Sequence, residues 1–354
     1  MRAEVVAMTG EHLDMQAIKK AGDILKEGGL VAFPTETVYG LGGNALDPRA
    51  SMKIYAAKGR PSDNPLIVHI AELEQLKKIT TEIPEGAKIL ADKYWPGPLT
   101  MILPKAEIVP DETTGGLKSV AVRFPSDRIA QELIKAAGGF VAAPSANTSG
   151  RPSPTLAEHV EEDLGDAIEM IIDGGQVGIG LESTIVDFTE EIPVVLRPGY
   201  ISLEMLQETL GEVRMDKGLL ITDSSVRPKA PGMKYRHYAP KADLSIVEGP
   251  MEQVVDAINR FAEEAVGKGE KVGIIATDET IGNYSGGIVR SIGSREEEET
   301  IAHHLYEVLR EFDSDDVTAI YSEAFYTPKM GQAIMNRLLK AAGHKIINIQ
   351  EESK

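Results

Sequence analysis

Two cations separated by one residue, Lys58 and Arg60, precede a strand-like run in the first part of the chain. Glycine stands between them, and Asn64 and the apolar run 65–70 follow. A lysine and an arginine held this close by a constrained backbone can bind the oxygens of a polyphosphate. A solvated basic turn explains the same residues when the segment is taken by itself.

Two polar side chains fall inside strand-like runs. His69 stands among the apolar residues of the run 65–70, which by itself is more typical of a hydrogen-bonded structural histidine than of a catalytic one. Arg123 lies in the run 119–124, and burying it requires a carboxylate partner from the protein or from a ligand. A structural ion pair and a substrate clamp both meet that requirement.

Hydroxyl, amide and arginine groups flank further strand-like runs. A loop is expected at 34–42, which contains Thr35, and another at 142–153, which is rich in Ser, Asn and Thr; these residue types can contact phosphates but also dominate ordinary turns. Ser183, at the start of one run, and Arg197, at the end of the next, would meet in a β-hairpin. Because strand ends are the usual ligand sites of open α/β sheets, we expect these segments to form one pocket.

Length, composition and charge limit the class of protein. A chain of 354 residues with 42% hydrophobic and 26% charged residues predicts a globular protein of two domains. The absence of cysteine excludes disulfides, thiolate catalysis and cysteine-bound zinc. A net charge of -18 argues against broad, nonspecific binding to nucleic acid, although it leaves room for local basic patches. No membrane span or secretory signal is recognisable, so we expect a cytoplasmic location.

The first 211 residues alternate helical and strand-like patterns, which predicts an α/β domain with a mixed sheet. Helices are expected at 13–27, 49–57, 86–94, 127–137, 155–164 and 202–210, and strands at 30–33, 65–70, 99–103, 119–124, 140–143, 170–172, 184–188 and 194–196. Residues 212–243 lose this periodicity, contain several prolines and carry a run of Lys and Arg without acidic residues between them. They indicate a basic linker.

From residue 244 to residue 354 the pattern restarts and predicts a smaller, Rossmann-like, doubly wound α/β domain with a largely parallel sheet. Strands are expected at 244–247, 272–276, 288–292, 317–321 and 345–349, and helices at 251–266, 296–312 and 332–342. Neither domain contains the glycine-rich turn of a dinucleotide-binding fold or a phosphate-binding P-loop, so a nucleotide ligand would have to be bound in another way.

The segments of the first domain occur in a familiar order. Through FPTETVYGLG, RPSDNPLIVHI, VAVRFP, APSANTSGRPSPT, ESTIVD and LRPG the chain resembles the YrdC-like family of threonylcarbamoyl-AMP synthases. The phrase APGMKYRHYAP and the domain after it are similar to the longer, two-domain members. The resemblance implies a YrdC-like twisted sheet domain and a nucleotidyltransferase that condenses L-threonine, bicarbonate and ATP into threonylcarbamoyl-AMP and pyrophosphate.

The resemblance also implies a role for each site residue. Those expected in catalysis are Lys58, Arg60, Ser145 and Asn147; those expected to bind L-threonine are Thr35, His69, Arg123, Ser145 and Ser183; those expected to bind ATP are Lys58, Arg60, Asn64, Ser119, Asn147, Ser153, Arg197, Tyr235, Arg236 and His237. The last three would belong to a lid that the linker forms over the pocket. Mg²⁺ would be held mainly by the ATP phosphates, with no dedicated metal ligands. The product would modify tRNAs that read ANN codons, through a downstream threonylcarbamoyl transferase complex, and the protein itself would make at most a weak contact with tRNA.

Two alternatives remain at this level. Hydrogenase maturation proteins that process carbamoyl phosphate share the YrdC-like domain, but they carry zinc-finger cysteines and an acylphosphatase-like module, which this sequence lacks. A protein that binds double-stranded RNA or tRNA without catalysis would use the same cationic residues. Tight RNA binding with a steep salt dependence would distinguish such a binder from a small-molecule synthase.

Overall fold

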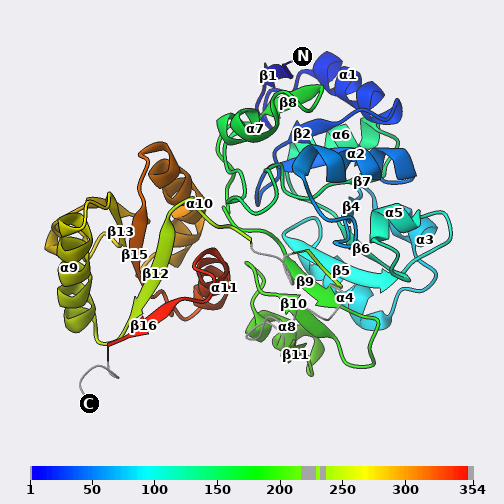
Figure 1. Cartoon of the computed structure of the whole chain (residues 1–354). Helices are drawn as coiled ribbons and strands as arrows, with labels where there is room; N and C mark the ends of the chain where they lie inside the picture. The colour runs from blue at the N-terminus through cyan, green and yellow to red at the C-terminus, as the bar shows by residue number, and fades with distance from the viewer. Residues whose placement is uncertain (1, 217–228, 232–236, 350–354) are drawn as a thin grey trace. The chain divides into compact units, whose positions relative to one another are not determined.

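The structure, a computed structural model, describes residues 2–216, 229–231 and 237–349. The chain divides into two compact units, shown in Figure 1. The first comprises Met1–Ser149 and Ser153–Tyr235, and the second comprises Gly150–Pro152 and Arg236–Lys354. Among the described residues, no helix is both long enough and apolar enough to cross a membrane.

The first unit contains a mixed sheet with the strand order β1-β8-β2-β3-β7-β4-β6-β5-β9-β10-β11. Its strands are β1 (Glu4–Ala7), β2 (Val31–Phe33), β3 (Gly40–Asn44), β4 (Ile67–His69), β5 (Leu99–Pro104), β6 (Ser119–Arg123), β7 (Val141–Ala142), β8 (Met170–Asp173), β9 (Thr184–Asp187), β10 (Val194–Arg197) and β11 (Arg214–Met215). Its helices are α1 (Met15–Lys26), α2 (Pro48–Lys58), η1 (Leu73–Gln75), α3 (Leu76–Ile79), α4 (Glu85–Tyr94), α5 (Asp111–Thr114), α6 (Arg128–Ala136), α7 (Ala157–Leu164) and α8 (Leu203–Leu210). The sheet contains both parallel and antiparallel pairs, such as β4·β6 and β5·β6. The predicted mixed sheet is confirmed.

Helices cover the sheet unequally. On one face, apolar residues of α2, α4, α7 and α8 pack against the strands in a single large core. On the other face, α1 and α6 pack over the half of the sheet that contains β2, β7 and β8. The half of that face formed by β4, β5, β6, β9 and β10 has its own small apolar cluster, to which no described helix contributes. This half carries three of the predicted site residues, His69, Arg123 and Arg197.

The local sequence explains how α2 positions Lys58 and, just after the helix, Arg60. Asp47 caps the start of the helix by accepting a hydrogen bond from the amide of Arg49, and Pro48 stands in the first turn. The helix ends at Lys58 because Gly59 adopts the left-handed conformation, with φ of 61°. Adding a side chain at Gly59 would strain this turn, so the glycine sets the direction in which Arg60 leaves the helix.

The expectation that residues 34–42 form a loop is wrong at its C-terminal end. Gly40–Asn44 forms β3, which pairs antiparallel with β2 and β7. Glycine is usually depleted in strands, but a Cβ atom at Gly42 would lie 2.9 Å from the Phe33 ring and 3.0 Å from Val141. Close packing against these neighbours therefore overrides the low strand propensity.

The second unit has a five-stranded sheet with the order β14-β13-β15-β12-β16. Its strands are β12 (Asp243–Glu248), β13 (Val272–Ala276), β14 (Ile288–Ser291), β15 (Ala319–Glu323) and β16 (Ile346–Asn348), and its helices are α9 (Met251–Gly267), η3 (Ile281–Asn283), α10 (Glu298–Ser314) and α11 (Gly331–Ala341). Every strand pair is parallel. Figure 1 shows α9 on one side of this sheet and α10 and α11 on the other. The predicted doubly wound, parallel domain is confirmed.

The three-residue segment Gly150–Pro152 is held within the second unit. Arg310 on α10 donates a hydrogen bond of 2.7 Å to the carbonyl of Pro152. The amide of Ala239 donates to the carbonyl of Gly150 at 2.9 Å, and Arg151 lies 3.7 Å from the carboxylate of Asp313. Gly150–Pro152 is therefore held by other residues of the second unit.

Candidate active site

Lys58 binds the backbone of the segment that follows β7. Its Nζ donates to the carbonyl of Ser145 at 2.5 Å and to the carbonyl of Asn147, while the Ser145 hydroxyl donates to Asn147 Oδ1 at 2.6 Å. The lysine is 1% exposed. The structure brings together three of the four residues predicted to act in catalysis, namely Lys58, Ser145 and Asn147.

Arg60 turns toward the start of β4. Its Nε donates to the carbonyl of Asn64 at 3.3 Å and its Nη2 to the carbonyl of Pro65 at 3.1 Å. Asn64 is 1% exposed, and its Oδ1 has no hydrogen-bond partner among the described residues. Ser119 begins β6, and the parallel register that pairs Ile67 with Ala121 places it beside Pro65. Arg60, Asn64 and Ser119 therefore gather at one end of these two strands.

His69 and Arg123 stand at the other end of the same two strands. They are register partners, and Thr100 on β5 is the partner of Arg123 on its other side. Partners directly opposite each other share a face, so all three side chains lie on the half face described above. Nδ1 of His69 lies 3.1 Å from the carbonyl of Ile67. Burial, assisted by the charge of Arg123, lowers the pKa of His69 to about 3, so the imidazole is neutral.

Arg123 contacts the segment that follows β2. Nη1 donates to the Thr37 hydroxyl at 2.9 Å, and Nη2 lies 2.8 Å from Oε1 of Glu36. The Thr35 hydroxyl is 2.9 Å from that of Thr37 and donates to the carbonyl of Val38 at 2.7 Å. The carboxylate partner that Arg123 requires is thus present in the protein. Nε and Nη2 nevertheless have no hydrogen-bond partner in the described part of the chain, so the guanidinium retains donors for a ligand.

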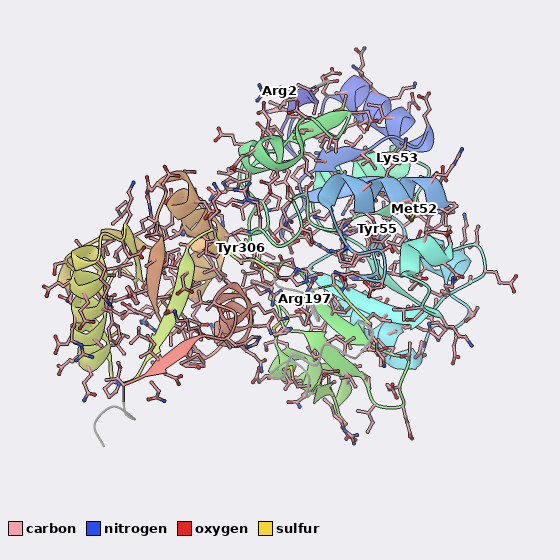
Figure 2. The ribbon with its side chains drawn as sticks, viewed as in Figure 1. Arg2, Met52, Lys53, Tyr55, Arg197 and Tyr306 are labelled. Atoms are coloured by element: carbon pink, nitrogen blue, oxygen red, sulfur yellow. The ribbon has the colours of Figure 1, made fainter. Side chains whose placement is uncertain are left out.

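The β9–β10 hairpin joins the remaining predicted residues, and its antiparallel pairing is confirmed. Arg197, labelled in Figure 2 and contributed by β10, donates from Nε to the carbonyl of Ser183 at 3.0 Å and from Nη2 to its hydroxyl at 3.1 Å. The Ser183 hydroxyl also lies 2.8 Å from that of Thr100. The Ser153 hydroxyl donates to the carboxylate of Glu182. Four strands therefore supply polar groups to one surface.

Part of the linker lies on this surface. Ala230 is fully buried and packs in the small apolar cluster with residues of β4, β5, β6, β9 and β10. Lys229 reaches Asp187 at 3.2 Å and Glu190 at 3.0 Å. Asp187 is the register partner of Ile102, two residues along β5 from Thr100, so it shares the face of the site. The linker is thus docked beside the predicted pocket.

The predicted lid residues are only partly described. Tyr235 and Arg236 lie outside the described residues. His237 belongs to the second unit, where its ring is 5.6 Å from that of Tyr238, which in turn stacks on Tyr306 of α10 at 5.2 Å. A role for these three residues in binding ATP stays a prediction.

Reasoning from the sequence assigned no role to several residues that bind the predicted ones. They are Glu36, Thr37, Thr100, Glu182 and Asp187. Glu36, Thr37 and Glu182 stand in segments that were identified, but which of them would contact an arginine or a serine depends on the register between distant strands. Thr100 carried no signal, because a threonine in a strand is ordinary.

A mixed α/β domain with polar side chains on one half of a sheet face, followed by a parallel α/β domain, defines a two-domain α/β protein with a candidate active site in its first domain. A family model described as "Telomere recombination" (Sua5, YciO and YrdC) matches residues 23–199, and one described as "Threonylcarbamoyl-AMP synthase, C-terminal domain" matches residues 201–343. The chain therefore belongs to the threonylcarbamoyl-AMP synthase family, in its two-domain form.

Individual relatives agree over nearly the full length. The chain is 48% identical to the threonylcarbamoyl-AMP synthase of Pyrococcus abyssi (strain GE5 / Orsay), covering 98% of this chain and 99% of the relative. It is 49% identical to that of Bacillus subtilis (strain 168), covering 93% and 94%. The crystal structure of P. abyssi Sua5 complexed with L-threonine matches 99% of this chain and 100% of its own, with a TM-score of 0.92 and 46% identity.

Proposed function

We propose that this protein is an L-threonylcarbamoyladenylate synthase, which joins L-threonine, bicarbonate and ATP and releases pyrophosphate. The observation that carries the proposal is a set of contacts around one sheet: Lys58 binds the segment of Ser145 and Asn147, Arg60 binds the start of β4, and Arg123 and Ser183 both neighbour Thr100 of β5. Relatives that align over almost the whole chain are named for this activity, and one was crystallised with L-threonine.

The reaction needs positioning and charge neutralisation more than a nucleophile. The threonine amine and bicarbonate give a carbamate, whose oxygen attacks the α-phosphate of ATP while the bond to pyrophosphate breaks. In the proposal, Thr35, His69, Arg123, Ser145 and Ser183 surround L-threonine. ATP and its phosphates are bound by Lys58, Arg60, Asn64, Ser119, Asn147, Ser153 and Arg197, with Tyr235, Arg236 and His237 added from the linker. Donors fixed before the reaction can stabilise the developing charge without reorganising.

The donor set suits a metal that arrives with the nucleotide. No group of three or more acidic or histidine side chains able to hold a metal ion occurs in the described parts of the chain. The buried Oδ1 of Asn64, which lacks a hydrogen-bond partner there, is the oxygen type that Mg²⁺ accepts as a ligand. When bound through the ATP phosphates, Mg²⁺ would neutralise charge on the transferred and leaving groups. The chain's own cations would supply the rest.

The proposal extends to the fate of the product. Threonylcarbamoyl-AMP is a reactive adenylate that a downstream tRNA threonylcarbamoyl transferase complex would consume, to modify the adenosine beside the anticodon of tRNAs that read ANN codons. A weak contact between this protein and tRNA, and a cytoplasmic location, remain predictions from the sequence.

The test is incubation of the protein with ATP, Mg²⁺ and bicarbonate together with each amino acid in turn, followed by mass detection of the adenylate. L-Threonine should give threonylcarbamoyl-AMP and an equal amount of pyrophosphate, and other amino acids should give little or none. Arg60→Ala should abolish pyrophosphate release while leaving the fold intact. A wild-type protein that forms no adenylate with threonine, or an unaffected Arg60→Ala variant, would contradict the proposal.

A further inference from the structure

Glu36 and Arg123 place opposite charges side by side in the predicted threonine pocket. Oε1 of Glu36 lies 2.8 Å from Nη2 of Arg123, with side-chain exposures of 14% and 5%. Within the described residues, neither oxygen of Glu36 and neither Nε nor Nη2 of Arg123 has a hydrogen-bond partner. A buried ion pair normally needs such hydrogen bonds to offset the cost of desolvation. The pair therefore has unused capacity that a ligand can satisfy.

An α-amino acid is complementary to this arrangement. It carries a carboxylate and an ammonium group on one carbon atom. The Nε–Nη2 edge of a guanidinium can bind a carboxylate through two parallel hydrogen bonds. A neighbouring carboxylate can then accept hydrogen bonds from the ammonium group. Arg123 and Glu36 present this cation and this anion at adjacent positions.

We propose that Glu36 binds the α-ammonium group of L-threonine and accepts its proton, an inference that rests on the proposed function. The ammonium proton passes to the Glu36 carboxylate, and the freed nitrogen lone pair forms a bond to the carbon of bicarbonate. One water molecule leaves, so the products are the carbamate anion, water and protonated Glu36. The carbamate oxygen then attacks the α-phosphate of ATP, and the proton on Glu36 returns to solvent after turnover.

The other titratable groups around Glu36 are less suited to this task. His69, on β4, is held neutral, because burial and Arg123 lower its pKa to about 3, which makes it a weak base. Burial raises the pKa of the Asp127 carboxyl, and the nearby charge of Glu36 raises it further. That carboxylate, however, caps α6 by accepting a hydrogen bond of 2.9 Å from the amide of Ala130. Arg123 offers no acceptor, because a guanidinium carries only N–H donors. Glu36 remains as the acceptor.

Binding of the substrate itself would assist the transfer. When the threonine carboxylate contacts Arg123, a second negative charge lies beside Glu36, and two carboxylates that share one cation favour uptake of a proton. Substrate binding and deprotonation of the amine would thus be coupled through a single guanidinium. A role for Glu36 that only orders its segment predicts no such coupling.

The experiment compares Glu36→Gln, Glu36→Asp and a matched charge-removal control, Glu85→Gln. Glu85 is exposed and forms a surface ion pair with Lys88, and it contacts none of the predicted site residues among the residues that the structure describes. Adenylate formation is measured from about pH 6 to pH 9 with saturating ATP, Mg²⁺ and bicarbonate, and L-threonine binding is measured by calorimetry. Removing a general base should lower the rate of Glu36→Gln about 100-fold or more at neutral pH. Because solution then has to supply the unprotonated amine, this rate should rise about tenfold per pH unit.

Glu36→Asp should keep the wild-type pH profile at a reduced rate, and Glu85→Gln should match the wild type. A Glu36→Gln profile parallel to that of the wild type would overturn proton acceptance and leave a positioning role. Threonine binding that is unchanged in Glu36→Gln would overturn the contact with the ammonium group. If the wild-type protein binds threonine and forms no adenylate, the proposed function fails, while the binding comparison still decides the role of Glu36.

Discussion

At the scale of single residues, Lys58 combines two roles that can be separated by experiment. Its ammonium group donates to two buried carbonyls of the segment that carries Ser145 and Asn147, and its charge is proposed to face ATP. Lys58→Met keeps the volume and removes the donor. Because a charged donor is lost and buried carbonyls are left without a partner, we expect destabilisation of about 2–4 kcal/mol. We also expect a loss of more than about 100-fold in adenylate formation.

A neighbouring lysine provides the control for this variant. Lys53, labelled in Figure 2, lies on the same helix and donates to the carbonyl of Gly28 at 2.6 Å. Lys53→Met removes a comparable hydrogen bond without touching the site, so its activity at a temperature where the protein is folded should stay within about twofold of the wild type. Denaturant unfolding and the adenylate assay measure the two effects. Equal losses of activity in both variants would contradict a specific role for Lys58.

His69 should make the stability of the protein depend on pH. Its pKa is lowered to about 3 in the folded state, whereas an unfolded histidine titrates near 6.5. Below about pH 6.5, His69 binds a proton in the unfolded chain but not in the folded chain. The free energy of unfolding therefore falls by about 1.4 kcal/mol for each pH unit until the pH reaches the pKa of folded His69. Urea unfolding at several pH values should show a shallower decline for His69→Gln. If the free energy of unfolding fell equally steeply with pH in the wild type and in His69→Gln, groups other than His69 would control the loss of stability at acidic pH.

At the scale of elements, the sequence predicted the longer helices and most central strands, because their signals are local, but it did not predict the short helices η1, α3, α5 and η3. Capping residues and apolar periodicity place α1, α2 and α9 within a few residues of the expected ranges. What could not be predicted depends on packing between distant segments. The strand β3 is stabilised by its fit against Phe33 and Val141, and the choice of Glu36 as the partner of Arg123 depends on strand order. Neither the packing of β3 nor the pairing of Glu36 with Arg123 produces a periodic pattern in the sequence.

The linker is the element whose docking can be tested directly. Ala230 is fully buried in the cluster on the site face, and Lys229 pairs with Asp187, whose side chain is 1% exposed. Ala230→Glu would place a charge and extra volume in this cluster and displace the linker, so we expect activity to fall roughly tenfold or more. Lys229→Ala should have a smaller effect in the same direction, because nearly half of that side chain is exposed.

Another cation near the linker serves as the control for these two variants. Arg214, on β11, pairs with Glu212 at 2.7 Å, and both side chains are more than 60% exposed. Arg214→Ala removes a cation and an ion pair but leaves the docked segment in place, so its rate should match the wild type. Steady-state rates at saturating and limiting ATP measure all three variants. Wild-type activity in Ala230→Glu would show that the docked segment does not serve the site.

At the scale of the whole molecule, the first unit holds every strand that carries a proposed threonine contact, yet it is not expected to suffice for full activity. Its two large cores are formed by residues before 216, so a chain that ends at Asp216 should still fold. That chain lacks the linker and the second unit. A chain that ends at Lys241 regains the linker but still lacks α10, whose Arg310 binds the carbonyl of Pro152 between Asn147 and Ser153.

Comparing these two chains with the full protein separates the contribution of the linker to activity from that of the second unit. We expect the chain that ends at Asp216 to be least active, because it loses both the docked linker and the residues that hold Gly150–Pro152. The chain that ends at Lys241 should recover part of the activity, since a segment that closes over a site contributes by excluding water and ordering substrates. Circular dichroism and unfolding curves must first show that both are folded, after which adenylate formation is measured at equal concentrations. Full activity in the shorter chain would mean that neither the linker nor the second unit contributes to chemistry, and the second unit would then act outside the reaction.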